Sequence, residues 1–246
     1  MGKKYFTLSF DDGLEQDKRV IRLMKQYGLK GTFNLNAGLF GARGEVKGIG
    51  TFSFQDCPEG VKHKWPFSYV RHNRIPQDEV LQVYEGMEIA THGFRHESLG
   101  AVSEDEMRAS VDADKAALEG LFGAPIVGHA YAQGSTSPAV QAYLKERGYR
   151  YARAVFPSGG YEFPEDPLNF RPSTSIILKD AMKLVERFKR EEAQDRDLLL
   201  YLWAHSYEMD YEKGDASWDA VERLFETIAG RSDIVYCTNS EAFSHI

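Results

Sequence analysis

The stretch LSFDDG, residues 8–13, places two adjacent carboxylates, Asp11 and Asp12, where an apolar strand-like segment ends. Two neighbouring negative charges raise each other's pKa and repel unless a positive charge compensates them. A turn is the simpler interpretation, because Asp and Gly are favoured turn residues. The alternative is a metal site, in which one carboxylate binds a cation and the other handles protons.

Two histidines, His92 and His96, follow another strand-like segment in THGFRH. Side chains four residues apart share a face on a helical turn, so both imidazoles could bind one cation. The spacing alone is a weak signal. Combined with one carboxylate, however, two neutral imidazoles make three ligands and leave a position for water, as in hydrolytic zinc sites. We therefore predict that Asp12, His92 and His96 bind a metal and that Asp11 is a free base.

Three further polar residues stand just past the ends of predicted strands. His205 follows the apolar segment DLLLYLWAH, and Tyr131 and Gln133 accompany the segment PIVGHAYA. Active sites of α/β barrels lie at the carboxyl ends of the strands, so these residues are expected near the Asp pair. For His205 the alternative is a core histidine, and catalysis is favoured.

Strand-like and helical segments alternate along most of the chain. Strands are predicted at 5–10, 31–38, 87–92, 125–132, 149–155, 197–205 and 233–238. Helices are predicted at 15–28, 76–86, 103–123, 137–148, 178–193 and 217–230. Repeated β–α units favour parallel strands with helices outside. The fold class is therefore α/β, and about seven strands fit a distorted (β/α) barrel better than a small open sheet.

The chain of 246 residues contains no linker, internal repeat or low-complexity tract, so we predict one catalytic domain over 1–246. The exception is the stretch 39–74, which is expected to be a long irregular insertion. Irregular segments of that length are usually functional or mobile.

Within the insertion, Trp65, Phe67 and Tyr69 alternate as on a strand. They are expected to form either a hydrophobic cap or a sugar-facing platform. His63 and His72 are expected to be solvated, with a lid over the site as the alternative.

The composition excludes several classes of partner. A net charge of -7 with interspersed signs gives no basic field for nucleic acid. No apolar run is long enough to span a membrane, and MGKKYFTLSFDDG lacks the features of a secretory signal, so a cytoplasmic protein is expected. Cys57 and Cys237 form no CxxC pair. No partner-binding stripe or coiled-coil pattern indicates an oligomeric state.

In order and spacing these motifs resemble those of the polysaccharide deacetylases, the NodB-homology or carbohydrate esterase family 4 group. The resemblance covers nearly the whole chain and implies a NodB-like barrel with fewer than eight repeats. LSFDDG is similar to the first motif, which makes Asp11 the catalytic base and Asp12 a metal ligand. THGFRH is similar to the second, which makes His92 and His96 metal ligands. LWAHSYE is similar to the late motif, whose histidine, here His205, is the general acid.

The third motif departs from the family pattern. Family members commonly have Arg-Pro-Pro-Tyr-Gly or Ala-Tyr-Pro-Tyr-Gly, whereas this chain has HAYAQG, with Ala132 for the proline and Gln133 for the tyrosine. In the family the backbone N–H of that tyrosine helps to stabilise the oxyanion, and a backbone donor survives substitution. Tyr131 and Gln133 are therefore predicted as substrate or oxyanion residues. The arginine that often orients the catalytic Asp is missing here, and Arg153 or Arg171 could replace it.

Two residues beside His205 leave alternatives open. Trp203 is expected either to pack in the barrel or to stack on a sugar. Glu208, three residues after His205, could contact substrate. His129 is interpreted as structural.

The expected reaction is hydrolysis of an N-acetyl group on a sugar or glycan by metal-activated water. Zn²⁺ is the expected metal, and Ni²⁺, Co²⁺ or Fe²⁺ would fit the same ligands. The alternative is a cytoplasmic hydrolase of a small amide, imide or ureide, which the missing export signal and the unusual third motif favour. A non-catalytic binding protein is disfavoured, because such a protein needs no proton base beside a metal ligand.

Overall fold

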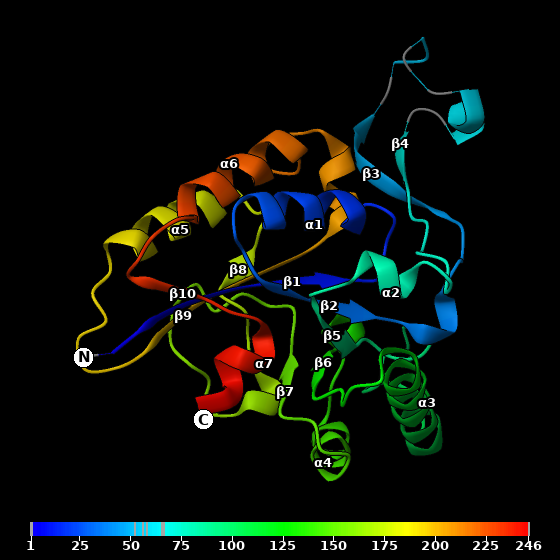
Figure 1. Cartoon of the computed structure of the whole chain (residues 1–246). Coiled ribbons are helices and arrows are strands. Elements are labelled where there is room, and N and C mark those ends of the chain that lie inside the picture. Colours follow the sequence, from blue (N-terminus) through cyan, green and yellow to red (C-terminus); the bar gives the residue numbers. More distant parts are fainter. Residues whose placement is uncertain (1, 52, 56, 58, 65–66, 246) are drawn as a thin grey trace.

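The computed structural model describes residues 2–245 except 52, 56, 58 and 65–66. Within them a parallel sheet has the strand order β7-β6-β5-β2-β1-β9-β8, with β10 paired beside the first half of β1 (Figure 1). The strands of this sheet are β1 (Lys4–Asp11), β2 (Gly31–Leu35), β5 (Glu88–Thr91), β6 (Gly128–Ala130), β7 (Tyr151–Arg153), β8 (Thr174–Ser175), β9 (Leu198–His205) and β10 (Ile234–Tyr236). The predicted α/β class and distorted barrel with about seven parallel strands are confirmed.

β1 lies at the centre of the sheet, and every one of its residues is buried. It pairs with β9 over its whole length, which sets Asp11 beside His205, and with β2, which sets Asp11 beside Asn34. Because all three strands are parallel, their carboxyl ends lie at one edge of the sheet. The central pairing therefore brings residues from the first and last thirds of the chain together.

Helices connect these strands and cover the sheet (Figure 1). They are α1 (Asp17–Gln26), α2 (Val80–Val83), α3 (Glu104–Phe122), α4 (Pro138–Glu146), α5 (Ala181–Arg190), α6 (Trp218–Ile228) and α7 (Asn239–Ala242). α6 packs against both α1 and α5, and α3 packs against α4. Among the described residues, no helix combines the length and the apolar character needed to cross a bilayer.

The sheet curls into a half-barrel whose two edge strands, β7 and β8, are joined by irregular chain. A single parallel bridge links Arg153, at the end of β7, to Phe170. The backbone of Ser158 and Gly159 then donates to Pro172 and Ser173 beside β8. This closure lets a residue at the end of β7 face the end of β1 across the barrel.

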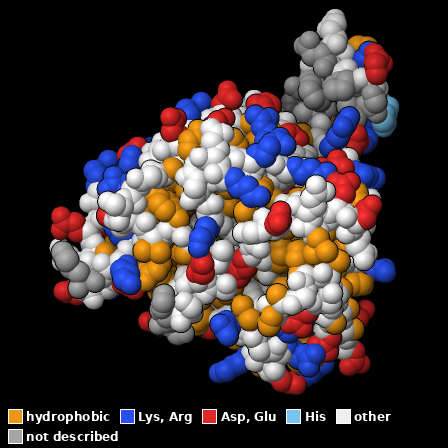
Figure 2. All heavy atoms as spheres, in the orientation of Figure 1, with side chains coloured by type: hydrophobic (Ala, Val, Ile, Leu, Met, Phe, Trp, Pro, Cys, Tyr) orange, Lys and Arg blue, Asp and Glu red, His pale blue; other side chains and the backbone are white. Residues whose placement is uncertain are grey.

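The stretch predicted as an irregular insertion at 39–74 contains regular structure, so this part of the prediction is wrong. An antiparallel hairpin of β3 (Glu45–Thr51) and β4 (Phe67–Arg71) projects from the body (Figures 1 and 2). The ammonium of Lys47 lies 3.5 Å from the centre of the Phe67 ring, and that of Lys64 lies 4.5 Å from the centre of Tyr69. Cations thus already occupy faces of two rings of the expected cap or platform, and Trp65 lies outside the described residues.

Candidate active site

Asp12, His92 and His96 are brought together as a potential metal-binding group. One ligand atom from each lies within 4.8 Å of the other two. Asp12 Oδ1 is 3.8 Å from His92 Nε2 and 3.6 Å from His96 Nε2. Two of the residues have a positive φ, 86° at Asp12 and 63° at His96. The two histidines are therefore aligned by a loop after β5 and not by the helical turn expected from their spacing.

The polar atoms of this group fit a divalent cation. The Nδ1–H of His92 donates to the Ala130 carbonyl at 2.7 Å, which directs the lone pair of Nε2 toward Asp12. His92 Nε2 and Asp12 Oδ1 are both buried and make no hydrogen bond among the described residues, although the Arg74 guanidinium lies 3.1 Å from Oδ1 as an ion pair. Burial lowers the pKa of His92 to about 4 and also lowers the pKa of His96, so both imidazoles are neutral at pH 7. Neutral imidazole and carboxylate are the ligands that Zn²⁺ takes in hydrolytic sites.

Arg153 holds the carboxylate of Asp11. Its Nη2 contacts Asp11 Oδ1 at 2.6 Å and Oδ2 at 2.5 Å, and the Asn34 amide donates to Oδ1 at 2.7 Å. Burial favours the neutral acid, but the charge and hydrogen bond of Arg153, together with His92 and His205, lower the pKa of Asp11. Of the two arginines considered from the sequence, Arg153 is the one at the site, because Arg171 instead binds the carbonyls of Phe156 and Pro157.

His205 lies across from Asp11, with its Nε2 4.0 Å from Asp11 Oδ2. Glu208 Oε2 accepts the backbone N–H of His205 at 2.8 Å and stands 3.5 Å from its Nδ1. Burial disfavours the imidazolium, but Glu208 and the two aspartates together raise the pKa of His205 to about 9. His205 is therefore charged at neutral pH, and Glu208 serves as its partner. Trp203 packs between His205 and Arg153. The centre of its ring lies 4.4 Å from the Arg153 guanidinium carbon and 5.4 Å from the centre of the His205 ring.

Two residues of the insertion reach Asp12: His72, which was placed over the site only as the alternative, and Arg74, which the sequence did not single out. His72 Nε2 lies 3.0 Å from Asp12 Oδ2, and Arg74 Nη2 lies 3.1 Å from Asp12 Oδ1. The expectation that His72 is solvated is wrong, because the chain after β4 returns directly past Asp12; His63 is exposed as expected. The only sequence signal is the spacing of two between His72 and Arg74, which puts both side chains on one side of an extended segment.

The residues of the third motif lie on the turn after β6. The Tyr131 side chain is fully buried and its hydroxyl donates to the Leu168 carbonyl at 2.6 Å, so it supports this turn. Gln133 is exposed with a φ of 56°, and its side chain accepts the Ser98 hydroxyl at 2.8 Å. His129 is buried with Nδ1 2.8 Å from the Thr91 hydroxyl, which agrees with its structural interpretation.

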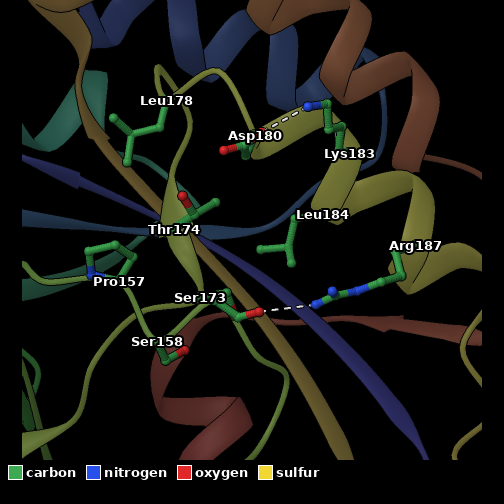
Figure 3. A pocket seen from close by; sticks show the side chains of 10 residues that line it. Pro157, Ser158, Ser173, Thr174, Leu178, Asp180, Lys183, Leu184 and Arg187 are labelled. Carbon is green, nitrogen blue, oxygen red and sulfur yellow. Dashed lines mark hydrogen bonds and ion pairs between the residues drawn. The ribbon is translucent and has the colours of Figure 1, made fainter.

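A separate cavity of about 510 Å³ lies between β8, residues 157–159 and α5 (Figure 3). Ser173, Thr174 and Leu184 line it, and Lys183 is paired with Asp180 at its rim. None of the site residues described above lines this cavity. The candidate chemistry therefore belongs to the strand ends and not to this hollow.

Comparison with known proteins assigns the chain to a family. The family model described as polysaccharide deacetylase matches residues 1–152. The chain thus belongs to the polysaccharide deacetylase family, the NodB-homology or CE4 group, as its motifs predicted. No curated protein matches the chain.

Solved structures of low sequence identity share the fold. The CE4 domain of a xylanase from the hindgut metagenome of Trinervitermes trinervoides is 15% identical, with 100% of this chain and 91% of that chain covered and a TM-score of 0.55. A family 4 acetyl xylan esterase from Clostridium thermocellum, solved with a cobalt ion, is 14% identical over 99% and 91%, with a TM-score of 0.53. A CE4 pseudoenzyme from Bacillus anthracis is 15% identical over 97% and 65%, with a TM-score of 0.54.

Proposed function

We propose that the chain, as one catalytic domain over residues 1–246, is a divalent-metal-dependent hydrolase that removes acetyl groups from N-acetylated sugars or glycans. The observation that carries the proposal is the pairing of a base and an acid around one ligand group. Asp11, lowered in pKa by Arg153, and His205, raised in pKa by Glu208, flank Asp12, His92 and His96. Membership of the polysaccharide deacetylase family supports the reaction class.

The two flanking residues have opposite protonation states at neutral pH. The Asp11 carboxylate is ionised and held by Arg153, so it can take a proton from the attacking water. His205 carries a proton that it can deliver to the departing amine, which cannot leave as an anion at neutral pH. Asp11 at the end of β1 is therefore the proposed proton acceptor, and His205 at the end of β9 is the proposed proton donor.

The ligand group has a different task. Zn²⁺, or alternatively Ni²⁺, Co²⁺ or Fe²⁺, held by Asp12, His92 and His96 would supply Lewis-acid polarisation of the acyl carbonyl. The backbone N–H of Gln133, on the turn after β6, is the proposed donor to the developing oxyanion. This role needs no particular side chain, so it is compatible with Gln in place of the family's tyrosine.

Elemental analysis tests the metal site first. We expect about one equivalent of metal in the wild type, loss of it in His92→Ala, and retention in His63→Ala, which changes an exposed histidine of the insertion. Acetate release from N-acetylglucosamine oligomers should then be abolished by Asp11→Asn, which keeps the ligands. A wild type without metal after incubation with zinc would refute the proposal.

A second candidate is hydrolysis of a small amide, imide or ureide at the same residues. It is favoured by the replacement of the proline and tyrosine of the third motif by Ala132 and Gln133. The same residues would act as base, acid and ligands. Comparing rates on N-acetylated oligosaccharides with rates on small cyclic imides distinguishes the two candidates.

A further inference from the structure

The end of the insertion is attached to the loop that follows the Asp pair. An antiparallel bridge joins Leu14 to Arg74, and backbone hydrogen bonds of 2.9 Å flank it on both sides, between residues 13–15 and 73–75. The Gln16 side chain adds a bond of 2.9 Å to the Arg71 carbonyl. The position of the segment 71–75 is therefore set by the same loop that carries Asp12.

Alternate side chains of this segment face Asp12. His72 contacts one carboxylate oxygen, Oδ2, at 3.0 Å, whereas Arg74 lies 3.1 Å from Oδ1 and also donates to the Asp12 backbone carbonyl. A carboxylate only accepts hydrogen bonds when ionised, so the hydrogen shared with Oδ2 belongs to Nε2 of His72. The imidazole is therefore a donor to the oxygen that points away from His92 and His96.

We propose that His72 is a positioning residue for the metal ligand Asp12, and that through it the insertion sets the affinity of the site for a divalent metal. The inference rests on the proposed metal-dependent function. His72 lies outside the group whose ligand atoms fall within 4.8 Å of one another, so it acts through Asp12. By holding Oδ2, it keeps Oδ1 directed at His92 Nε2 and His96 Nε2, at 3.8 and 3.6 Å.

The need for such a residue follows from the freedom of the Asp side chain. The terminal torsion of Asp is broad, and Arg74 lies against Oδ1 only, so without His72 the oxygen Oδ2 has no fixed partner among the described residues. The His72 ring is itself held edge-on against Tyr207, with centroids 5.0 Å apart, and Tyr207 in turn lies 5.4 Å from the His205 ring. Hydrogen-bond partners of metal ligands typically change metal affinity by about 10- to 100-fold when they are removed.

Zinc binding to the metal-free protein tests the role of His72 without reference to activity. Isothermal titration with Zn²⁺ would compare wild type, His72→Ala, His72→Gln and the control His63→Ala. We expect His72→Ala to bind at least 10-fold more weakly. His72→Gln places an amide N–H near the position of Nε2 and should remain within about threefold of the wild type, and His63→Ala should be unchanged. Circular dichroism of each apo-protein establishes that it is folded.

The outcomes separate this proposal from the proposed function. Wild type that binds no zinc would refute both. Wild type that binds one equivalent, with His72→Ala equally tight, would overturn the role of His72 and leave the function intact. The role would also be overturned if folded His72→Gln lost as much affinity as His72→Ala, since the donated hydrogen bond would then not be what matters.

Discussion

Arg153 and Asp11 form a fully buried ion pair that spans the half-barrel, from the end of β7 to the end of β1. The guanidinium reaches both carboxylate oxygens at 2.6 and 2.5 Å and lies over the Trp203 ring. Paired charges of this kind are costly to separate, because the remaining charge stays buried and uncompensated. The pair thus fixes both the orientation and the ionisation of the proposed base.

Replacement of this arginine should shift the acid limb of the pH–rate profile. Arg153→Lys keeps a positive charge but loses the two-oxygen contact, so the pKa of Asp11 should rise. Since Asp11 acts as the ionised form, kcat/KM should fall at low pH and the acid limb should move toward neutrality. Below its pKa each unit by which the pKa of Asp11 rises should lower kcat/KM about tenfold, so the loss should be larger at low pH than above neutrality. The pH dependence of kcat/KM measures it.

Arg171→Lys is the matched control for this variant. Among the described residues Arg171 donates to the backbone carbonyls of Phe156 and Pro157, outside the site. Its replacement should leave the acid limb in place. An acid limb that is the same in Arg153→Lys as in wild type would mean that the limb does not report Asp11.

The alkaline limb depends on Glu208. Burial opposes the charge on His205, and Glu208 with the two aspartates raises the pKa of His205 to about 9. A raised histidine pKa keeps the acid form present above neutral pH, so the alkaline limb of the profile should lie above pH 7. In Glu208→Gln the imidazolium loses its nearest carboxylate, and the decline should begin at lower pH. If the alkaline limb is unchanged in Glu208→Gln while His205→Gln is inactive, a group other than Glu208 sets the pKa of this limb. Glu212→Gln changes an exposed glutamate and is the control.

The sequence was sufficient to predict that Asp12, His92 and His96 lie together near Asp11 and His205, because parallel strands bring their carboxyl ends to one edge. These residues stand at the ends of three strands, β1, β5 and β9. In the sheet β9 is beside β1, and β5 is one strand further on the other side, so the position of each motif after its strand was enough to predict that the side chains meet. The choice between Arg153 and Arg171 was left open. It depends on how far the sheet curls between β7 and β8, and no local pattern encodes that curvature.

The contact of His72 with Asp12 was missed for a related reason. Residues 36–71 separate β2 from His72, and their path is set by the hairpin β3–β4 and by the pairing of the chain after it with residues 13–15. Short elements were missed as well. β8 has two residues and α7 has four, too few for a hydrophobic period to develop.

Gly128 tests the tight packing at β6. A Cβ at this position would lie 2.0 Å from the Tyr151 hydroxyl, and that ring is buried and bonded to Glu88 at 3.0 Å, so it cannot move aside. Gly128→Ala should therefore reduce the free energy of unfolding by about 1–3 kcal/mol. Gly120→Ala in α3 is the control, since no atom lies within 4 Å and Ala favours the helix. Urea unfolding measures both, and equal stability of the two variants would contradict the expected clash.

Asp17 should give the fold a measurable pH dependence of its own. It is fully buried and accepts hydrogen bonds from the Leu14 N–H at 3.0 Å, the Tyr84 hydroxyl at 2.7 Å and the Ser206 hydroxyl at 2.6 Å. Despite these donors, burial raises the pKa of Asp17 from 3.8 to about 7. The folded state therefore binds this proton more tightly than the unfolded state does.

The sign of the effect follows from the direction of that shift. The stabilising contribution of Asp17 is complete below about pH 4, declines as the pH rises to about 7, and is absent above it. Asp17→Asn removes this decline. The difference in free energy of unfolding between pH 5 and pH 8 should then be smaller than in wild type by about 2–3 kcal/mol, since about two pH units lie below the pKa at about 1.4 kcal/mol each. Urea unfolding of the metal-free proteins at both pH values measures it. Asp105→Asn, on an exposed turn of α3, should keep the wild-type difference. If Asp17→Asn also kept the wild-type difference between pH 5 and pH 8, the pKa of the Asp17 carboxyl would be the same in the folded and unfolded states. Its three hydrogen-bond donors would then keep the carboxyl ionised.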